Sequence, residues 1–383
     1  MSRKVNWHYL RRISQFVVIA LVLYLTLKHL NLGIEKAAPI DAFCPFGGFE
    51  GLLTYITTGA FLSRIFLSSF TLLAIVLIFT IFFGRVFCGY FCPLGALQEM
   101  IRVFGRKLGI KKDLELPSII DKYARYLKYV ILVVIIVLSY KLGDLVFRNY
   151  DPYNALMHLG NEWEEKVYGY SILIILLIIS LFTKSFWCRY FCPLGATLGV
   201  AKKIGFFRLK RDKTTCVSCN HCNYVCPAGL DVANSDSVKS ADCISCLNCV
   251  SECPKNSLTV SIFGKKISKN KFSLIVVTLF IVVVLAASLS PLWQQAGESN
   301  VKDSQGQINV ENIRGSNTLE FIIKESGLPF TAFQTEFNLP ANIDQSIMLK
   351  EIAPKYGIKN KAGNPLETED FREFIKNNLM SKN

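Results

Sequence analysis

The sequence has few of the residues from which self-contained catalytic centres are usually built. Its 383 residues include four histidines, and they show no Ser-His-Asp set, phosphate-binding loop or acid-base pair in a recognisable site. A Cys-x-x-Cys-His sequence for covalent haem attachment is also missing. Any oxidoreductase activity therefore needs a partner protein or a quinone, because the chain offers no substrate-converting site of its own.

Charged residues are scarce in five apolar stretches, which approach the roughly 20 residues needed to cross a bilayer. Because intramembrane charge marks ion paths, this scarcity argues against a transport role. The chain is 51% hydrophobic, and we expect a mainly α integral membrane protein with about five transmembrane helices. The stretches centre on residues 13–31, 66–84, 126–143, 168–184 and 273–290.

The distribution of Lys and Arg predicts the orientation. With the N-terminus inside, the inner segments hold 27 Lys and Arg against 9 acids, and the outer segments hold 15 against 20. The positive-inside rule then places the N-terminus in the cytoplasm, residues 272–290 as the fifth helix of the inner membrane, and the tail, residues 291–383, on the extracytoplasmic side. This bias accounts for the net charge of +14, and since no nucleic-acid recognition motif accompanies it, we expect no nucleic-acid partner.

Cysteine is the most informative residue that the chain does contain. Residues 216–253 carry Cys-x2-Cys-x2-Cys-x3-Cys-Pro twice, which is the ligand pattern of a protein holding two [4Fe-4S] clusters. A structural zinc site is the alternative, but zinc needs four ligands from two pairs rather than triplets closed by Cys-x3-Cys-Pro. In the cluster pattern, the fourth Cys of each motif ligates the other cluster. The predicted ligands are Cys216, Cys219, Cys222 and Cys253 for one cluster, and Cys243, Cys246, Cys249 and Cys226 for the other.

Residues 206–268 are accordingly predicted to form a bacterial 2[4Fe-4S] ferredoxin-like α+β insert on the cytoplasmic side. Clusters and free thiols suit the reducing cytoplasm. Residues 258–262 alternate between apolar and polar side chains and predict a strand that closes this insert.

A second cysteine pattern is duplicated in the membrane core, residues 1–205. The sequence Cys-x3-Cys-Pro-Leu-Gly-Ala begins at Cys88 and again at Cys188. We interpret residues 43–100 and 150–200 as repeat units. Both run from outside to inside, so they are parallel repeats related by an axis along the membrane normal.

An approximate twofold axis would bring the two thiol pairs together, and four thiolates are what one further [4Fe-4S] cluster needs. The alternatives are two reactive thiol pairs or a zinc site. Gly89, Gly95 and Gly195 allow close approach of backbone to the sulfurs or to neighbouring helices. Arg189 replaces Gly89 in the second copy, and we interpret it as an interfacial arginine, with stabilisation of cluster charge as the alternative. The predicted ligands of this third cluster are Cys88, Cys92, Cys188 and Cys192.

Three residues are candidates for a site near the outer face. Cys44 is the thirteenth cysteine, and its repeat partner is Asp151. We interpret Cys44 as a small buried side chain, and the alternative is an outer cofactor site that pairs it with repeat-related groups. His29 and His158 are also predicted near the outer face, where they would ligate a haem or contact a quinone.

The tail opens with a polar linker and then shows short helical signals. Thr318 and Ser346 precede apolar periodic runs that stop at Gly327 and Gly357, and Thr368 precedes a third run. The tail contains no Cys and no His, so it is a poor binder of metal or haem. We expect a small helical extracytoplasmic interaction domain.

The paired Cys-x3-Cys-Pro motifs together with the dicluster segment resemble the membrane polyferredoxins of the NapH, NosR and FixG type. This resemblance implies a bacterial membrane protein that passes electrons between the quinol pool or a cytoplasmic donor and an extracytoplasmic acceptor. NosR-type relatives carry a flavin-binding outer domain, but this chain has no Ser/Thr-Gly-Ala-Thr flavinylation sequence. FixG-type relatives carry an outer β-sandwich, whereas this tail predicts helices, so the NapH type is nearest in plan.

We therefore expect an iron–sulfur electron relay, with a quinone as a further candidate cofactor. Its expected partners are a cytoplasmic ferredoxin- or flavodoxin-like protein or a membrane subunit, and an extracytoplasmic cytochrome or reductase. The alternative is an accessory or maturation factor that serves the assembly of a periplasmic or membrane metalloenzyme. The sequence leaves the direction of electron flow open.

Overall fold

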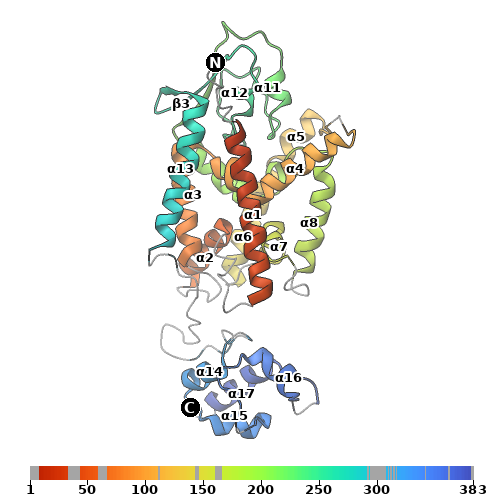
Figure 1. Ribbon diagram of the computed structural model, residues 1–383, viewed down its shortest axis with the longest axis vertical. Helices are drawn as coiled ribbons and strands as arrows, with labels where there is room; N and C mark the ends of the chain where they lie inside the picture. The colour runs from red at the N-terminus through yellow and green to blue at the C-terminus, as the bar shows by residue number, and fades with distance from the viewer. Residues whose placement is uncertain are drawn as a thin grey trace. The chain divides into compact units, whose positions relative to one another are not determined.

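The computed structural model consists of two compact units, one formed by residues up to 293 and the other by residues from 308 onward. The first unit is a helical bundle with a small sheet at one end, and the second is a group of short helices (Figure 1). The described residues are 8–32, 44–58, 67–110, 113–142, 146–159, 166–290, 293, 308, 310, 313, 315, 317–340, 342–360 and 363–380.

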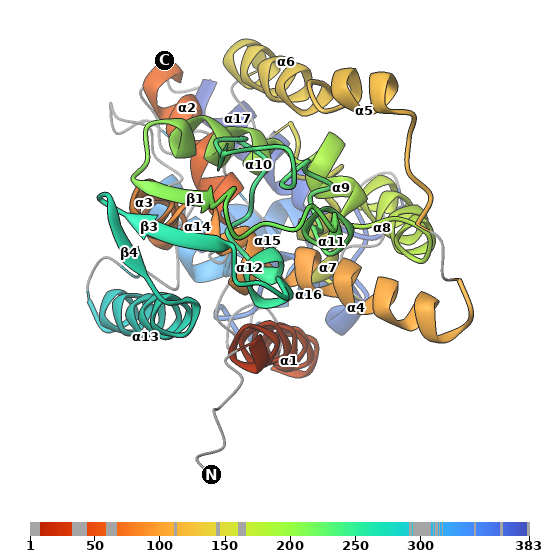
Figure 2. The ribbon, with the colours of Figure 1, turned by 90° about the horizontal axis from the view of Figure 1, so that it is seen from above.

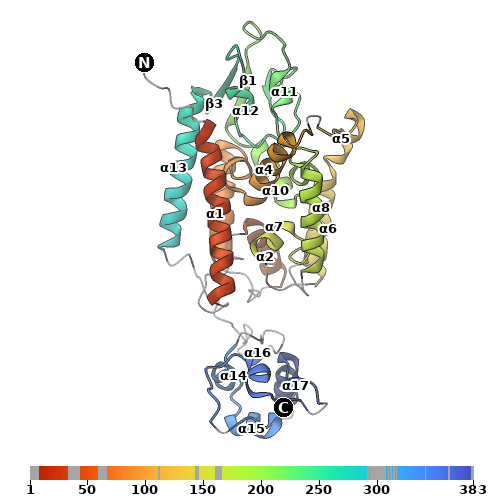
Figure 3. The ribbon, with the colours of Figure 1, turned by 45° about the vertical axis from the view of Figure 1, so that its right-hand side comes forward.

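Helices occupy all five predicted apolar stretches, and they run roughly side by side along the first unit (Figure 3). They are α1 (His8–Leu32), α3 (Leu67–Phe83), α6 (Leu127–Leu142), α8 (Val167–Ser180) and α13 (Lys269–Ser288). Among the described residues, three segments are long and apolar enough to cross a membrane, namely Tyr9–Lys28, Ser118–Lys141 and Lys269–Ser288. Helices α3 and α8 are shorter, with 17 and 14 residues. Large apolar side chains such as Phe16, Val134 and Ile281 are exposed on the bundle, which is typical of a surface that faces lipid.

Shorter helices complete two copies of one helical arrangement. They are α2 (Pro45–Thr58), the π-helical turn η2 (Phe87–Phe91), α4 (Pro93–Lys107), α5 (Ser118–Ala124), α7 (Pro152–Met157), α9 (Phe186–Tyr190) and α10 (Pro193–Lys203). Helix α4 packs on α1, α7 and α8, and helix α10 packs correspondingly on α6, α2 and α3. The contact between α1 and α7 likewise has its counterpart between α6 and α2. The repeat is therefore longer than the predicted units, because α1 and α6 belong to it as well.

The dicluster segment forms a four-stranded antiparallel sheet in the order β2-β1-β3-β4. Its strands are β1 (Phe207–Arg211), β2 (Ser237–Val238), β3 (Leu258–Ile262) and β4 (Lys265–Ile267), and its short helices are α11 (His221–Tyr224) and α12 (Asn248–Ser251). The predicted strand at 258–262 is confirmed as β3. Phe263 and Gly264 both have positive φ, which matches the two-residue turn that joins β3 to β4.

The sheet packs directly on the end of the bundle rather than forming a separate unit (Figure 2). The Phe206 amide donates to the Ile81 carbonyl at the end of α3 (2.8 Å), and the Phe207 and Phe272 rings lie 5.5 Å apart. Gly84 has φ of +76°, and a Cβ there would lie 2.3 Å from the Ser245 hydroxyl. The first copy of the repeat and the dicluster segment therefore share one core.

The second unit contains α14 (Leu319–Ser326), α15 (Phe330–Phe337), α16 (Leu349–Tyr356) and α17 (Thr368–Met380). The Thr318 hydroxyl caps α14, and Gly327 and Gly357 end α14 and α16 in left-handed conformations, as the sequence predicts. Helix α15 was not predicted, because it starts after Pro329 without a side-chain cap. Phe333, Phe337 and Phe371 form the centre of its core.

Candidate metal centres

The two Cys-x2-Cys-x2-Cys loops of the dicluster segment have the same unusual backbone conformation. Ser218 and Asn220 in the first loop have φ of +54° and +56°, and Ser245 and Leu247 at the equivalent positions have +55° and +60°. Residues other than glycine rarely occupy this left-handed region, and such strain is concentrated at ligand-binding loops. The two loops are therefore shaped alike, as two equivalent ligand sites require.

Four of the predicted ligands line one small enclosed cavity, and they are Cys226, Cys243, Cys246 and Cys249. This is the crossed set, in which the last Cys of the first motif joins the first three of the second. The amide of Leu230 donates to the Cys226 sulfur (3.4 Å). Burial raises the pKa of the Cys246 thiol to about 12, so a thiolate at this site needs a neighbouring positive charge such as that of bound iron. The chemistry of this cavity fits a cluster held by thiolates.

The other predicted set lies nearer the surface. Cys216 and Cys222 are half-buried, and Cys219 is exposed. A hydrogen bond from the Ser218 backbone amide, followed by one from Arg211 (3.6 Å), lowers the pKa of the Cys216 thiol. Cys253, the predicted fourth ligand, is half-buried just after α12, and its place beside the other three stays a prediction.

The four thiols of the duplicated motif also come together, where the two copies meet. Cys92 and Cys192 precede α4 and α10, and each sulfur accepts a hydrogen bond from a glycine amide, Gly95 (3.4 Å) and Gly195 (3.2 Å). Burial raises the pKa of both thiols, and the charges of Cys88 and Cys188 raise it further. Cys88 and Cys188 line one cavity, and the Arg85 guanidinium that contacts Cys88 also packs against Gly195, next to the second thiol pair. A group with its own positive charge, such as an iron cluster, would relieve the repulsion between the thiolates.

Polar side chains contact two of these four thiols, Cys88 and Cys188. The Arg85 guanidinium lies 3.8 Å from the Cys88 sulfur, and the Gln98 amide nitrogen lies 3.7 Å from the Cys188 sulfur. A Cβ at Gly195 would lie 2.8 Å from the Arg85 guanidinium. A Cβ at Gly89 would lie 2.6 Å from the Ile244 carbonyl oxygen, between two predicted ligands of the dicluster segment. The glycines therefore allow close approach, as the sequence predicts.

Among the described residues, no group of three or more His, Cys, Asp or Glu side chains stands close enough to hold a single metal ion.

Each copy also supplies a buried cation that the sequence analysis missed. Arg11 in α1 donates to the Gly89 carbonyl (2.9 Å), and Lys128 in α6 donates to the Arg189 carbonyl (3.4 Å). Gly89 and Arg189 are equivalent residues, so the two cations play equivalent structural roles. A basic residue near the start of each apolar stretch is the sequence signal for these two cations. The positive-inside rule uses such residues only to predict the orientation of the helices.

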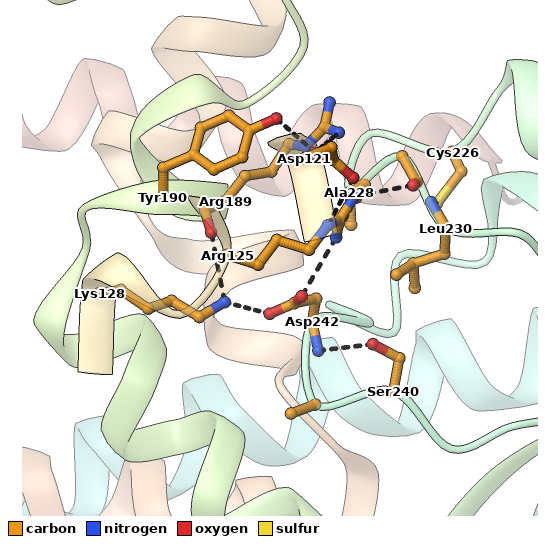
Figure 4. Close-up of polar contacts among 12 residues, drawn as sticks. Asp121, Arg125, Lys128, Arg189, Tyr190, Cys226, Ala228, Leu230, Ser240 and Asp242 are labelled. Carbon is orange, nitrogen blue, oxygen red and sulfur yellow. Dashed lines mark hydrogen bonds and ion pairs between the residues drawn. The ribbon is translucent and has the colours of Figure 1, made fainter. Parts of the chain in front are cut away.

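An ionic network joins the dicluster segment to the second copy (Figure 4). Asp242 pairs with Arg125 (3.1 Å) and with Lys128, which is fully buried. Burial opposes ionisation of Asp242, but Lys128 and Arg85 outweigh it and hold the pKa of this carboxyl below its usual value. Arg189 pairs with Asp121 (2.7 Å), which also accepts from the Tyr190 hydroxyl. Arg189 is thus a buried member of an ion-pair network, and its position at the membrane interface stays a prediction.

The predicted outer-face residues lie in two elements of the first unit. Cys44 is buried just before α2, and Asp151 caps α7, so these repeat partners occupy equivalent helix starts. Both lie within electrostatic range of Tyr153. His158 is buried, and its ring nitrogen Nδ1 lies 3.3 Å from the Asn154 carbonyl oxygen. The side chain of His29 lies outside the described residues.

Comparisons with known proteins agree with the motif assignments. The family model described as "4Fe-4S binding domain" matches twice, at residues 65–111 and 167–214, and so covers both Cys-x3-Cys-Pro motifs. The model described as "4Fe-4S dicluster domain" matches residues 208–254, which contain the eight ferredoxin-type cysteines.

Curated relatives extend over larger parts of the chain. An uncharacterized protein of Methanocaldococcus jannaschii is 34% identical over 226 residues, which cover 58% of this chain and 88% of the relative. The protein named "Putative electron transport protein YccM" of Escherichia coli is 28% identical over 68% of this chain and 76% of its own length. The "Ferredoxin-type protein NapH" of Haemophilus influenzae is 33% identical over 47% of this chain and 63% of its own length.

No solved structure matches the chain. The family matches, the relatives and the apolar helices together identify an iron–sulfur electron-transfer protein of the membrane. The chain belongs to the membrane polyferredoxin family.

Proposed function

We propose that this protein relays electrons through three [4Fe-4S] clusters between a cytoplasmic donor or the quinol pool and an extracytoplasmic redox partner. The observation that carries the proposal is the contact at Gly89, where the backbone of the first Cys-x3-Cys motif meets Ile244 of the dicluster loop. This contact supports an arrangement in which the two thiol groups occupy adjoining layers of one core. The third set, near the surface, offers an entry or exit point for a redox partner.

The proposed ligands follow the three thiol groups. Cys88, Cys92, Cys188 and Cys192 hold the cluster between the repeats, and Cys226, Cys243, Cys246 and Cys249 hold the buried ferredoxin-type cluster. Cys216, Cys219, Cys222 and Cys253 hold the outermost one.

The charge distribution supports the proposed orientation. We propose five membrane-crossing helices, with the N-terminus and the dicluster segment in the cytoplasm. The two shorter helices, α3 and α8, would be the second and fourth crossings, and exposed side chains such as Ile78 and Ile174 would face the lipid. The second unit is then extracytoplasmic and offers a docking surface for a redox partner.

A groove between α1 and α4 supports the quinol pool as one reactant. It has a volume of about 610 Å³, and apolar side chains such as Phe16, Met100 and Phe104 line most of it. Glu99 lines this groove and also two smaller cavities, one polar and one containing Cys88 and Cys188. A hydrophobic ligand with hydroxyl groups, such as a quinol, fits these walls.

Glu99, which pairs with Arg11 and accepts from the Gln15 amide (3.1 Å), places polar groups in the wall of the groove, where the hydroxyl groups of a quinol would lie. One quinol becomes one quinone and releases two electrons and two protons. The clusters held by the thiol groups named above would accept the two electrons, and the two protons would leave by way of the polar cavity beside Glu99. Quinone reduction is the same process in reverse, so the groove serves either direction of electron flow.

The relay is tested by mixing oxidised protein anaerobically with decylubiquinol and following cluster reduction by absorbance. We expect rapid reduction, at least tenfold slower in Met100→Trp, which fills the groove. Val200→Trp, at the equivalent exposed position of the second copy, is the matched control and should react like the unaltered protein. If reduced ferredoxin reduces the clusters and decylubiquinol does not, the cytoplasmic donor is correct. If neither reacts, and a strain lacking this protein accumulates a metalloenzyme without its metal, the maturation function replaces the relay.

A further inference from the structure

Positive charge is placed differently in the two copies of the Cys-x3-Cys unit. Three residues before the first Cys, the first copy has Arg85 and the second has Ser185. One residue after that Cys, the first copy has Gly89 and the second has Arg189. Each copy therefore contributes one arginine at this level, but from a different position.

Of these two arginines, Arg85 is the one whose guanidinium lies against a thiol of the duplicated motif. Its Nη2 atom lies 3.8 Å from the Cys88 sulfur, and its Nη1 atom donates to the Ala241 carbonyl (3.0 Å). The residue is 1% exposed and packs against Gly195 of the other copy. Arg189 instead binds Asp121 and packs against Gly229 of the dicluster segment.

The charge of Arg85 is only partly neutralised by its carboxylate neighbour. Asp242 lies 3.9 Å from Arg85, but the same carboxylate pairs more closely with Arg125 and Lys128. One anion thus serves three cations, and among the described residues Arg125 alone of the three pairs with a second carboxylate, Asp121. Much of the Arg85 field therefore acts on the adjacent thiolates, and in a buried site this field is weakly screened.

We propose that Arg85 raises the reduction potential of the iron–sulfur cluster held by Cys88, Cys92, Cys188 and Cys192, and that Asp242 moderates this effect. The proposal rests on the third cluster of the proposed function. Reduction adds one negative charge to the cluster, so a buried cation beside its ligand stabilises the reduced form. Arg85 is then a positioning and tuning residue for electron transfer.

The proposal is tested by redox titration of the third cluster, followed by electron paramagnetic resonance, in full-length protein. In Arg85→Gln, we expect the ratio of reduced to oxidised cluster at a fixed ambient potential to fall at least tenfold, which corresponds to about 59 mV for one electron. Arg85→Lys, which keeps the charge, should retain most of the original ratio. Arg189→Gln is the matched control and should leave the third cluster unchanged.

Asp242→Asn gives a prediction of opposite sign. Removing this carboxylate leaves more of the Arg85 charge uncompensated, so the reduced fraction of the third cluster should rise. A general loosening of the site would shift the reduction potential in the same direction in both variants, so shifts of opposite sign exclude it. If Arg85→Gln loses its iron, the shift in Asp242→Asn tests the proposal instead. Unchanged potentials, or equal shifts in Arg85→Gln and Arg85→Lys, would overturn the proposal. If the unaltered protein lacks a third signal and its iron, the proposed function itself fails at that cluster.

Discussion

The two copies of the Cys-x3-Cys-Pro unit share one backbone plan but carry different charged side chains. Both follow an apolar helix, turn at the second Cys and start a new helix with Pro-Leu-Gly-Ala, and both pack reciprocally on the other copy. Arg85 of the first copy is directed at a thiol, whereas Arg189 of the second pairs with Asp121 beside the dicluster segment. The shared backbone therefore gives the thiols equivalent positions in the two copies. The differing arginines act on a thiol in the first copy and on the contact with the dicluster segment in the second.

Removing one thiol from either copy should have the largest effect. We expect Cys92→Ala and Cys192→Ala each to lose about four irons per chain, because all four thiolates hold one cluster. Cys44→Ala, at an outer position, should keep its iron. The check is the iron content of anaerobically purified protein. Loss of iron from only one of the two thiol variants would break the proposed equivalence of the copies.

Removing the anion shared by the copies should have the next largest effect. Asp242→Ala leaves Lys128 buried without its carboxylate partner, which costs about 3–5 kcal/mol. Thermal unfolding in detergent measures this loss. Glu369→Ala in the second unit is the control, because its ion pair with Arg372 is exposed. A melting temperature of Asp242→Ala equal to that of the control would contradict a stabilising role for the ion pairs between the dicluster segment and the second copy.

Adding one methyl group to the first copy should have an intermediate effect. In Gly89→Ala the new Cβ meets the Ile244 carbonyl oxygen at 2.6 Å, and the strain costs about 1–3 kcal/mol. At Gly95 the nearest atom lies 3.2 Å away, so Gly95→Ala should be milder. The comparison uses thermal unfolding of the two variants side by side. Equal melting temperatures of the two variants would show that Gly89 does not pack tightly against Ile244 of the dicluster loop.

Changing the pH between 8 and 5 should have the smallest effect on the stability that the Asp242 ion pairs contribute. The pKa of Asp242 is lower in the folded protein than in the unfolded chain. Its contribution to stability is therefore complete above about pH 4 and is lost only as the pH falls through the lower, folded-state pKa. The difference in melting temperature between unaltered protein and Asp242→Ala should stay constant from pH 8 to pH 5. A difference that shrinks within this range would contradict the ion-pair assignment.

The thiol groups could be predicted because ligand spacing is a local property. Two triplets with the same spacing adopt the same turns at Ser218 and Ser245, and the duplicated Cys-Pro sequence starts two equivalent helices. The helical stretches were also readable, since burial in lipid or in a bundle demands long apolar runs.

The charged surroundings of the thiols could not be predicted in the same way. The contact from Lys128 to Asp242 joins residues that lie 114 positions apart, and no local pattern encodes it. Helix α1 was not recognised as part of the repeat, because its similarity to α6 lies in packing rather than in motif residues. The groove beside Glu99 likewise forms only when α1 and α4 come together.

The iron content of intact, anaerobically purified protein tests the central claim most directly. Three thiol groups holding three clusters predict about twelve irons per chain, falling to about eight when Cys88 and Cys188 are both replaced by serine. A content of about eight irons in the unaltered protein, unchanged in that double variant, would contradict the cluster between the two copies.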